Sequence, residues 1–184
     1  MADGTLKVGT ITTSSGSGTI TIGQSGETIS IPSGATATGF PDNTPSFQAG
    51  LSSNQSIPNT TTTVVINDTE IYDTDSAYNT STGIFTVPSG KAGKYYFYSL
   101  VRRNNFEPAA RFTLGIKKNG TEFTASDMSI KGNYAGGFIG SQTNCSAGDE
   151  IKPVVYHDDG AAANIFGTAA GSFTYFGGYR IIGA

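Results

Sequence analysis

The chain has 184 residues, enough for one domain with a short appendage, and 36% of them are hydrophobic, enough to bury a core. Only 14% are charged while 25 are glycine, which nearly excludes a helical bundle, because helix surfaces carry charged side chains and glycine weakens helix interiors. The net charge of −3 predicts no binding to nucleic acid, and the longest aliphatic run, Val64-Val65-Ile66, is too short to span a membrane.

The N-terminal part of the chain carries a nine-residue repeat, in residues 10–18, 19–27 and 28–36. Each repeat alternates threonine or serine with isoleucine and ends in a Gly/Ser-rich turn. Alternation places the isoleucines on one side of a short strand. One such strand, called a rung below, is too narrow to bury these side chains unless other strands pack beside it. We therefore expect residues 1–44 to form a β-repeat segment, either a small meander on a larger body or a stem wound from several chains. The first residues lack a charged stretch followed by an apolar one, so no secretory signal is predicted.

A break rich in glycine, proline, asparagine and aspartate at residues 37–45 separates this segment from the rest of the chain. After the break, short β-branched and aromatic runs alternate with turn signals, and Asn119-Gly120 between two such runs predicts a hairpin. This pattern predicts an all-β fold over residues 45–184, an antiparallel sandwich that is most economically a jelly roll. The expected strands are 47–51, 61–66, 84–87, 95–102, 111–117, 138–143, 150–156 and 172–182.

The run at residues 95–102 is aromatic on both faces. Tyr95 and Phe97 fall on one face, and Tyr96 and Tyr98 fall on the other. A sandwich strand normally has one face in the core and one in water, so we expect Tyr95 and Phe97 in the core and a partner over the second face. The last run, 172–182, is also apolar on both faces, and a homotrimer would cover both runs. The expected trimer interface consists of Tyr96, Tyr98, Leu100, Phe176 and Ile182.

Several motifs stand in a recognisable order along residues 45–184. They are SFQAGLSSNQSIP at 46–58, IYDTDSAYNTSTGIFTVPSG at 71–90, GKYYF at 93–97, KKNGTE at 117–122, SAGDEI at 146–151 and FGGYRIIG at 176–183. In this order and spacing they resemble the C1q/TNF-like jelly-roll family. The resemblance implies a ten-stranded jelly roll that assembles as a compact trimer, with its inner sheets around the threefold axis. The collagen stalk of the animal members is missing, and the insert at 104–112 is not typical of the family.

The Gly/Ser/Thr-rich leader is similar to segments in structural proteins of marine tailed phages. A C1q-like head on such a leader resembles a tail-fibre tip or a capsid-surface protein. The resemblance implies a virion-surface protein, made in the host cytoplasm, that docks on other virion proteins through residues 1–44 and attaches to a host-cell glycan or protein. Two alternatives stay open: a capsid (head) decoration protein, and a secreted C1q-like binding module, which the lack of a signal peptide disfavours.

Residues suited to catalysis are scarce. His157 is the only histidine and Cys145 the only cysteine, and no flanking motif supports a nucleophile–base pair between them. Cys145 cannot form an internal disulfide and is expected to be a buried thiol. We therefore expect no catalytic residues and no enzymatic activity.

Acidic residues offer weak candidates for a metal site. Asp158 and Asp159 lie near a strand end, and loop carboxylates suit calcium, which is the one cofactor considered. Ordinary turn chemistry accounts for such residues more economically, and no metal or other cofactor is expected. The same interpretation holds for Asp68, Glu70, Asp73 and Asp75.

Aromatic residues in Gly/Ala/Asn-rich loops are the remaining candidates for function. Jelly-roll loops at the free end of a trimer are natural recognition surfaces, and an aromatic ring there would stack on a sugar face. The alternative is that these rings only pin the loops down. The candidate ligand contacts are Phe106, Tyr134, His157 and Phe166.

Overall fold

The computed structural model describes residues 10–13, 18–35, 43–104, 111–128, 130–131 and 134–182. The chain divides into two units, residues 1–40 and 41–184. Most of the break expected at residues 37–45 lies outside the described residues. None of the described residues belongs to a helix that is long and apolar enough to cross a membrane.

In the first unit, the described parts of the repeats contain two turns and no strand. A backbone hydrogen bond of 3.0 Å closes the turn Gln24–Glu27, and one of 3.1 Å closes Pro32–Ala35. The strands expected in the repeats are therefore absent from residues 10–13 and 18–35 of a single chain. The extended part of a repeat becomes a β-strand only where a neighbouring stretch of backbone forms hydrogen bonds with it.

The second unit is a sandwich of two antiparallel sheets. The larger sheet consists of β1 (Ser46–Gly50), β2 (Gln55–Ile57), β4 (Thr69–Asp73), β7 (Gly93–Asn104), β10 (Ile130–Lys131), β11 (Tyr134–Cys145), β13 (Ala163–Ile165) and β14 (Tyr175–Arg180). The smaller sheet consists of β3 (Thr63–Val64), β5 (Tyr78–Asn79), β6 (Ile84–Thr86), β8 (Phe112–Lys118), β9 (Thr121–Asp127) and β12 (Glu150–His157).

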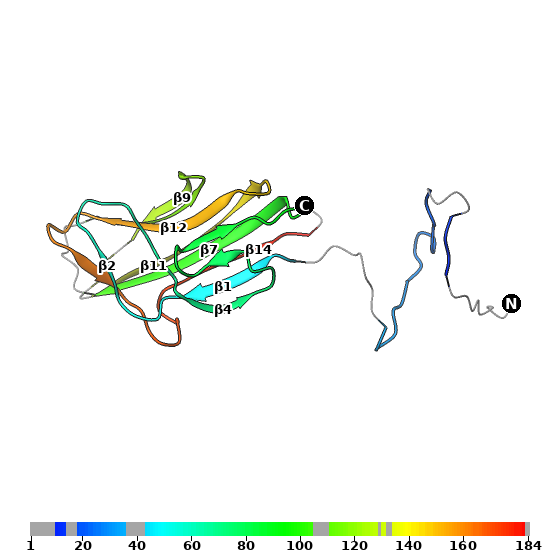
Figure 1. The fold of residues 1–184 in the computed structure, drawn as a ribbon, viewed down its shortest axis with the longest axis horizontal. Coiled ribbons are helices and arrows are strands. Elements are labelled where there is room, and N and C mark those ends of the chain that lie inside the picture. Colours follow the sequence, from blue (N-terminus) through cyan, green and yellow to red (C-terminus); the bar gives the residue numbers. More distant parts are fainter. Residues whose placement is uncertain are drawn as a thin grey trace. The chain divides into compact units, whose positions relative to one another are not determined.

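The strand order brings distant parts of the chain side by side. The larger sheet runs β10-β11-β7-β14-β1-β4, with β13 joining β2 to β7, and the smaller runs β5-β6-β12-β8-β9, with β3 on β12. Figure 1 shows β9 and β12 in one layer and β7, β14, β1 and β4 in the other. The long strand β7 lies in the middle of the larger sheet, between β11 and β14. This arrangement confirms the predicted antiparallel sandwich.

Each of the eight expected runs overlaps a strand, but six strands were not predicted: β2, β4, β5, β9, β10 and β13. Five of them are short or lie at sheet edges, and β9 has the mostly polar sequence TEFTASD. Such strands lack the regular alternation of apolar residues that marks a half-buried strand. Their pairing is instead imposed by the strands beside them.

The core between the sheets is built from stacked aromatic rings. Phe47 on β1 lies 4.6 Å, ring centre to ring centre, from Phe85, and 5.1 Å from both Tyr78 and Phe176. Phe97 on β7 reaches the same cluster, 5.5 Å from Phe85. Offset and edge-on contacts at these distances add to the free energy gained from burying the rings.

The hairpin predicted at Asn119-Gly120 joins β8 to β9, with Lys118 opposite Thr121. Asn119 has φ 50° and Gly120 has φ 83°. A two-residue loop with both φ angles positive is a type I′ turn, whose twist matches that of the paired strands. The prediction of this hairpin is confirmed.

Replacing Phe47 by alanine should lower the free energy of unfolding by about 3–5 kcal/mol, because it removes a fully buried ring and leaves a cavity. The matched change Phe123→Ala on β9 removes a half-buried ring and should cost less than half as much. Urea unfolding of both variants at equal protein concentration measures the difference. Equal losses would show that Phe47 is not central to the core.

Candidate functional site

The outward face of the larger sheet carries a continuous cluster of aromatic side chains. The ring of Tyr96 lies 5.7 Å from that of Tyr179 and 6.1 Å from that of Tyr98. Tyr98 in turn lies 6.2 Å from both Phe138 and Tyr175. With the neighbouring edge strand these residues form the aromatic face: Tyr72, Tyr96, Tyr98, Phe138, Tyr175 and Tyr179.

The aromatic face is open to solvent and uncharged at its centre. Phe138 is 53% exposed, Tyr72 42% and Tyr179 38%. The outward positions of β7 between Lys94 and Arg102 carry only Tyr96, Tyr98 and Leu100, and those of β1 and β14 are likewise uncharged. A contiguous exposed apolar patch on a folded domain usually marks an interaction surface.

Glycines allow the tyrosine rings to lie flat on the sheet. A Cβ atom at Gly140 on β11 would collide with the Tyr96 ring, and one at Gly177 on β14 would collide with the Tyr98 ring. The Tyr98 hydroxyl donates to Gln48 Oε1 at 3.1 Å, and burial and the nearby tyrosines raise the pKa of Tyr98. The Tyr98 hydroxyl therefore stays protonated, and the centre of the face presents a neutral ring whose polar end is hydrogen-bonded.

Of the expected interface residues, Tyr96, Tyr98 and Leu100 lie on this outward face and are half-buried, while Tyr95 and Phe97 are fully buried as expected. The assignment of Phe176 is wrong. Its side chain is fully buried and packs 5.1 Å from the Phe47 ring.

The register of β14 explains the error about Phe176. Phe176 pairs with Ser99 on the inward side, while Tyr175 and Tyr179 pair with Leu100 and Tyr96 on the outward side. The sequence indicated that this run is apolar on both faces, but it did not indicate which face lies on the same side of the sheet as Tyr96. Ile182 lies beyond β14 and is 42% exposed.

His157 is a buried structural residue and not a loop residue, which corrects its candidacy as a ligand contact. It ends β12 with no exposed surface, and its Nε2 atom donates to the Ile57 carbonyl oxygen at 2.9 Å. Its Nδ1 atom lies 3.2 Å from Asp159 Oδ1, and Asp159 also pairs with the buried guanidinium of Arg103. These contacts fasten the loop after β12 to β2 and β7.

Cys145 and His157 cannot act as a pair. Cys145 ends β11 beside the start of β12, whereas His157 stands at the other end of β12. Seven residues of extended strand separate the two ends by about 23 Å. Burial raises the pKa of the Cys145 thiol to about 11, so the group is neutral and unreactive near neutral pH.

The acidic candidates for a metal site take part in other interactions. Asp158 Oδ1 accepts from the Arg111 backbone at 2.6 Å, and Asp159 is held by Arg103. Asp68 accepts from both the backbone and the hydroxyl of Ser52 at 2.7 Å. Asp73 accepts from the Tyr78 backbone, and Asp75 lies 3.6 Å from Lys91 Nζ. Among the described residues, no group of three histidine, cysteine or acidic side chains is placed to hold a metal ion.

The other loop candidates have different outcomes. Phe106 lies outside the described residues. Tyr134 belongs to β11, where it pairs with Asn104, so its placement in a loop is wrong. Phe166 is half-buried and packs edge-on against Phe173 at 6.4 Å.

Arg102 completes a small cluster with these two rings. Its guanidinium carbon lies 4.5 Å from the centre of the Phe173 ring and 5.9 Å from that of Phe166. Phe173 is 38% exposed and was missed as a contact residue, because it was assigned to the last strand. The position of Phe173, in the Gly/Ala-rich stretch that follows Phe166, was the feature of the sequence that could have identified it as a contact residue.

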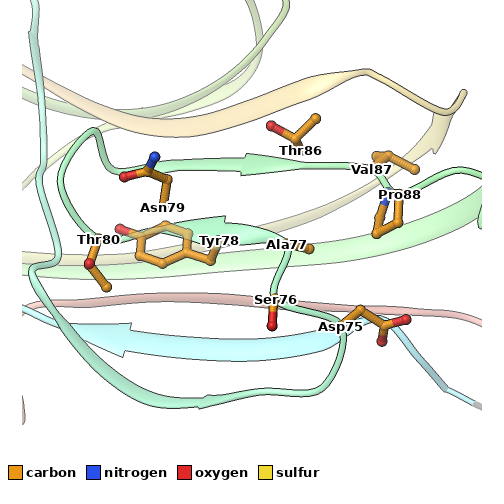
Figure 2. Close-up of a pocket in the computed structure, with 9 residues that line it drawn as sticks. All are labelled: Asp75, Ser76, Ala77, Tyr78, Asn79, Thr80, Thr86, Val87 and Pro88. Atoms are coloured by element: carbon orange, nitrogen blue, oxygen red, sulfur yellow. The ribbon is translucent and has the colours of Figure 1, made fainter.

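A polar groove of about 550 Å³ lies beside β5 and β6. Figure 2 shows Asn79 and Thr80 near one end and Asp75 near the other, with the Tyr78 ring between them. The Tyr78 ring is buried and packs on the core, so it offers no exposed surface for stacking. The rest of the lining consists of hydroxyl, amide and small apolar groups, and Asp75, its one titratable group besides Tyr78, is paired with Lys91. The groove therefore holds no pair of groups suited to acid–base chemistry.

No family model matches the chain, and no curated protein matches it. Solved structures do. The globular domain of zebrafish complement 1qA protein aligns with a TM-score of 0.51 and 17% identity, over 74% of this chain and 97% of that one. The PRD1 vertex protein P5 aligns with a TM-score of 0.57 and 19% identity, over 77% of this chain and 99% of that one. At such identities the likeness shows the fold alone, and it confirms the predicted C1q-like jelly roll.

The buried ion pair should matter far more to stability than an exposed one. Asp159→Asn leaves the Arg103 guanidinium without its carboxylate inside the protein and should cost about 3–5 kcal/mol. The matched change Asp127→Asn breaks the exposed pair with Arg111 and should leave the unfolding midpoint nearly unchanged. Denaturant unfolding of both variants tests this. Equal unfolding midpoints for the two variants would show that Asp159 does not stabilise the loop that follows β12.

Proposed function

We propose that this protein is a non-enzymatic, trimeric module on the surface of a phage virion, and that it attaches the particle to its host. The aromatic face is the observation that supports the proposal, because an exposed apolar surface of this kind is normally covered by a partner in an assembly. Residues 1–44 dock the module on the particle, and loops of the jelly roll contact a host-cell glycan or protein. No metal or other cofactor takes part.

The chemistry of the aromatic face supports self-association. It is uncharged at its centre and rich in tyrosine, and interface cores are enriched in aromatic residues and depleted of charge. Identical neutral surfaces meet without like-charge repulsion. The C1q-like fold, with the outward face of its larger sheet turned to a threefold axis, would bury the same residues in every subunit.

Attachment through weak, repeated contacts suits the remaining surface. The cluster of Arg102, Phe166 and Phe173 is exposed in part, and its two rings come from the Gly/Ala-rich stretch between β13 and β14. Rings of this kind bind sugar faces, and three copies around one axis raise the overall affinity without new contacts. We therefore place the host contact at this cluster and at the insert that contains Phe106, which lies outside the described residues.

A capsid decoration role is the second candidate. The fold that the chain shares with a protein named as a vertex protein supports this second role. In that role the trimer would cover or hold together capsid subunits, and the loop aromatics would only stabilise their loops.

Placing a charge at the centre of the aromatic face should prevent assembly. Tyr98→Asp buries an unpaired carboxylate in the trimer, so we expect a folded monomer where the unmodified chain is a trimer. Ser126→Asp, on the exposed side of β9, adds the same charge and should leave the trimer intact. Solution mass at micromolar concentration distinguishes these states, and a monomeric unmodified chain would contradict the proposed assembly.

Purified trimeric head should compete with virions for susceptible cells. We expect saturating head to reduce adsorption, and Phe173→Ala to weaken this competition with no loss of the trimer. If saturating head leaves adsorption unchanged and electron microscopy locates the protein on the capsid, the host-attachment proposal is wrong and the decoration role takes its place.

A chain that begins near Phe40 should still form trimers but fail to join particles.

A further inference from the structure

The isoleucines of the first unit are exposed in a single chain. Ile20, Ile22, Ile29 and Ile31 are 42–64% exposed. Residues two apart lie on the same side of an extended chain, so the second and third repeats each present one pair of isoleucines on one side and threonine or serine on the other. A linker that only spans a distance has no need of such pairs.

The two described turns use the same device in successive repeats. Each has Ser-Gly at its central positions, and the glycines, Gly26 and Gly34, have φ angles of 92° and 90°. A positive φ at the third residue of a turn is the type II geometry that favours glycine. The chain is therefore bent in the same way after each isoleucine pair, as a stack of similar rungs requires.

Charge places no barrier to contact between copies of this segment. Glu27 is the only charged residue among residues 10–35, and its carboxylate accepts from the Gln24 backbone at 2.6 Å. The hydrogen bonds described within residues 18–35 belong to the turns, so the rungs between them keep backbone groups available for pairing with another chain.

Three heads would hold three such segments within reach of one another. Ser46, the first residue of β1, follows Ile31 by 15 positions in the chain, a stretch that spans at most about 50 Å. Tethered segments meet at an effective concentration in the millimolar range, which favours pairing between copies over capture of a dilute partner.

We propose that the repeats of three copies pack against one another, isoleucine against isoleucine, as a shared β stem. This inference rests on the trimer of the proposed function. The segment would then reach the virion as one ordered three-chain body, and its isoleucine pairs would line the inside of the stem.

Cysteine cross-linking of the full chain tests the stem. Ile22→Cys places a thiol on the inward side and Thr21→Cys places one on the outward side of the same rung. With a short bis-maleimide at neutral pH, Ile22→Cys should give cross-linked dimers several-fold faster than Thr21→Cys. The native Cys145 is buried and its pKa is raised to about 11, so the unmodified chain serves as the background control.

A second pair, Ile31→Cys against Ser30→Cys, repeats the comparison one rung later and covers the case in which the Ile22→Cys substitution disturbs the stem. Yields that do not change on tenfold dilution show linkage within one trimer. Equal rates for inward and outward cysteines, or no linkage in a chain of trimeric mass, would overturn the stem and leave the proposed function standing. A monomeric mass would overturn both.

Discussion

The whole sandwich depends on one strand, β7, that is aromatic on both faces. Strand β7 buries Tyr95, Phe97 and Ser99 against the smaller sheet and turns Tyr96 and Tyr98 outward. It also pairs with β11 and β14 along most of its length, so its register fixes which residues of both neighbours point inward. A slip of one residue would expose the core rings and bury the tyrosine hydroxyls without partners.

Glycine and tyrosine are matched across this sheet. Gly140 and Gly177 stand where the rings of Tyr96 and Tyr98 lie, and Gly178 stands where the Phe97 ring lies on the inward side. Removing side chains from the neighbouring strands lets large rings lie flat against the backbone. The rings of Tyr96 and Tyr98 thereby occupy the space that side chains at Gly140 and Gly177 would fill.

The loop end of the sandwich is held by buried polar groups and not by apolar packing alone. Arg103 at the end of β7 and His157 at the end of β12 meet around Asp159. A buried charge is tolerated only when it is paired, so the three groups constrain the loop between β12 and β13. The same contacts remove His157 and Asp159 from any role in ligand binding, and leave the half-exposed aromatics beside them as the recognition candidates.

Local sequence pattern was sufficient to predict the all-β fold, most long strands and the division of β7 into two aromatic faces, because the alternation of side chains is recorded by neighbouring residues. The hairpin at Asn119-Gly120 was predictable in the same way, since its turn type needs positive φ at two successive residues. Long-range pairing was needed to place Phe176 in the core and Tyr175 and Tyr179 on the outward face, because β7 and β14 are matched across more than 70 residues of sequence. The burial of His157 was unpredictable for the same reason: Ile57, whose carbonyl oxygen accepts its hydrogen bond, lies 100 residues away in the chain.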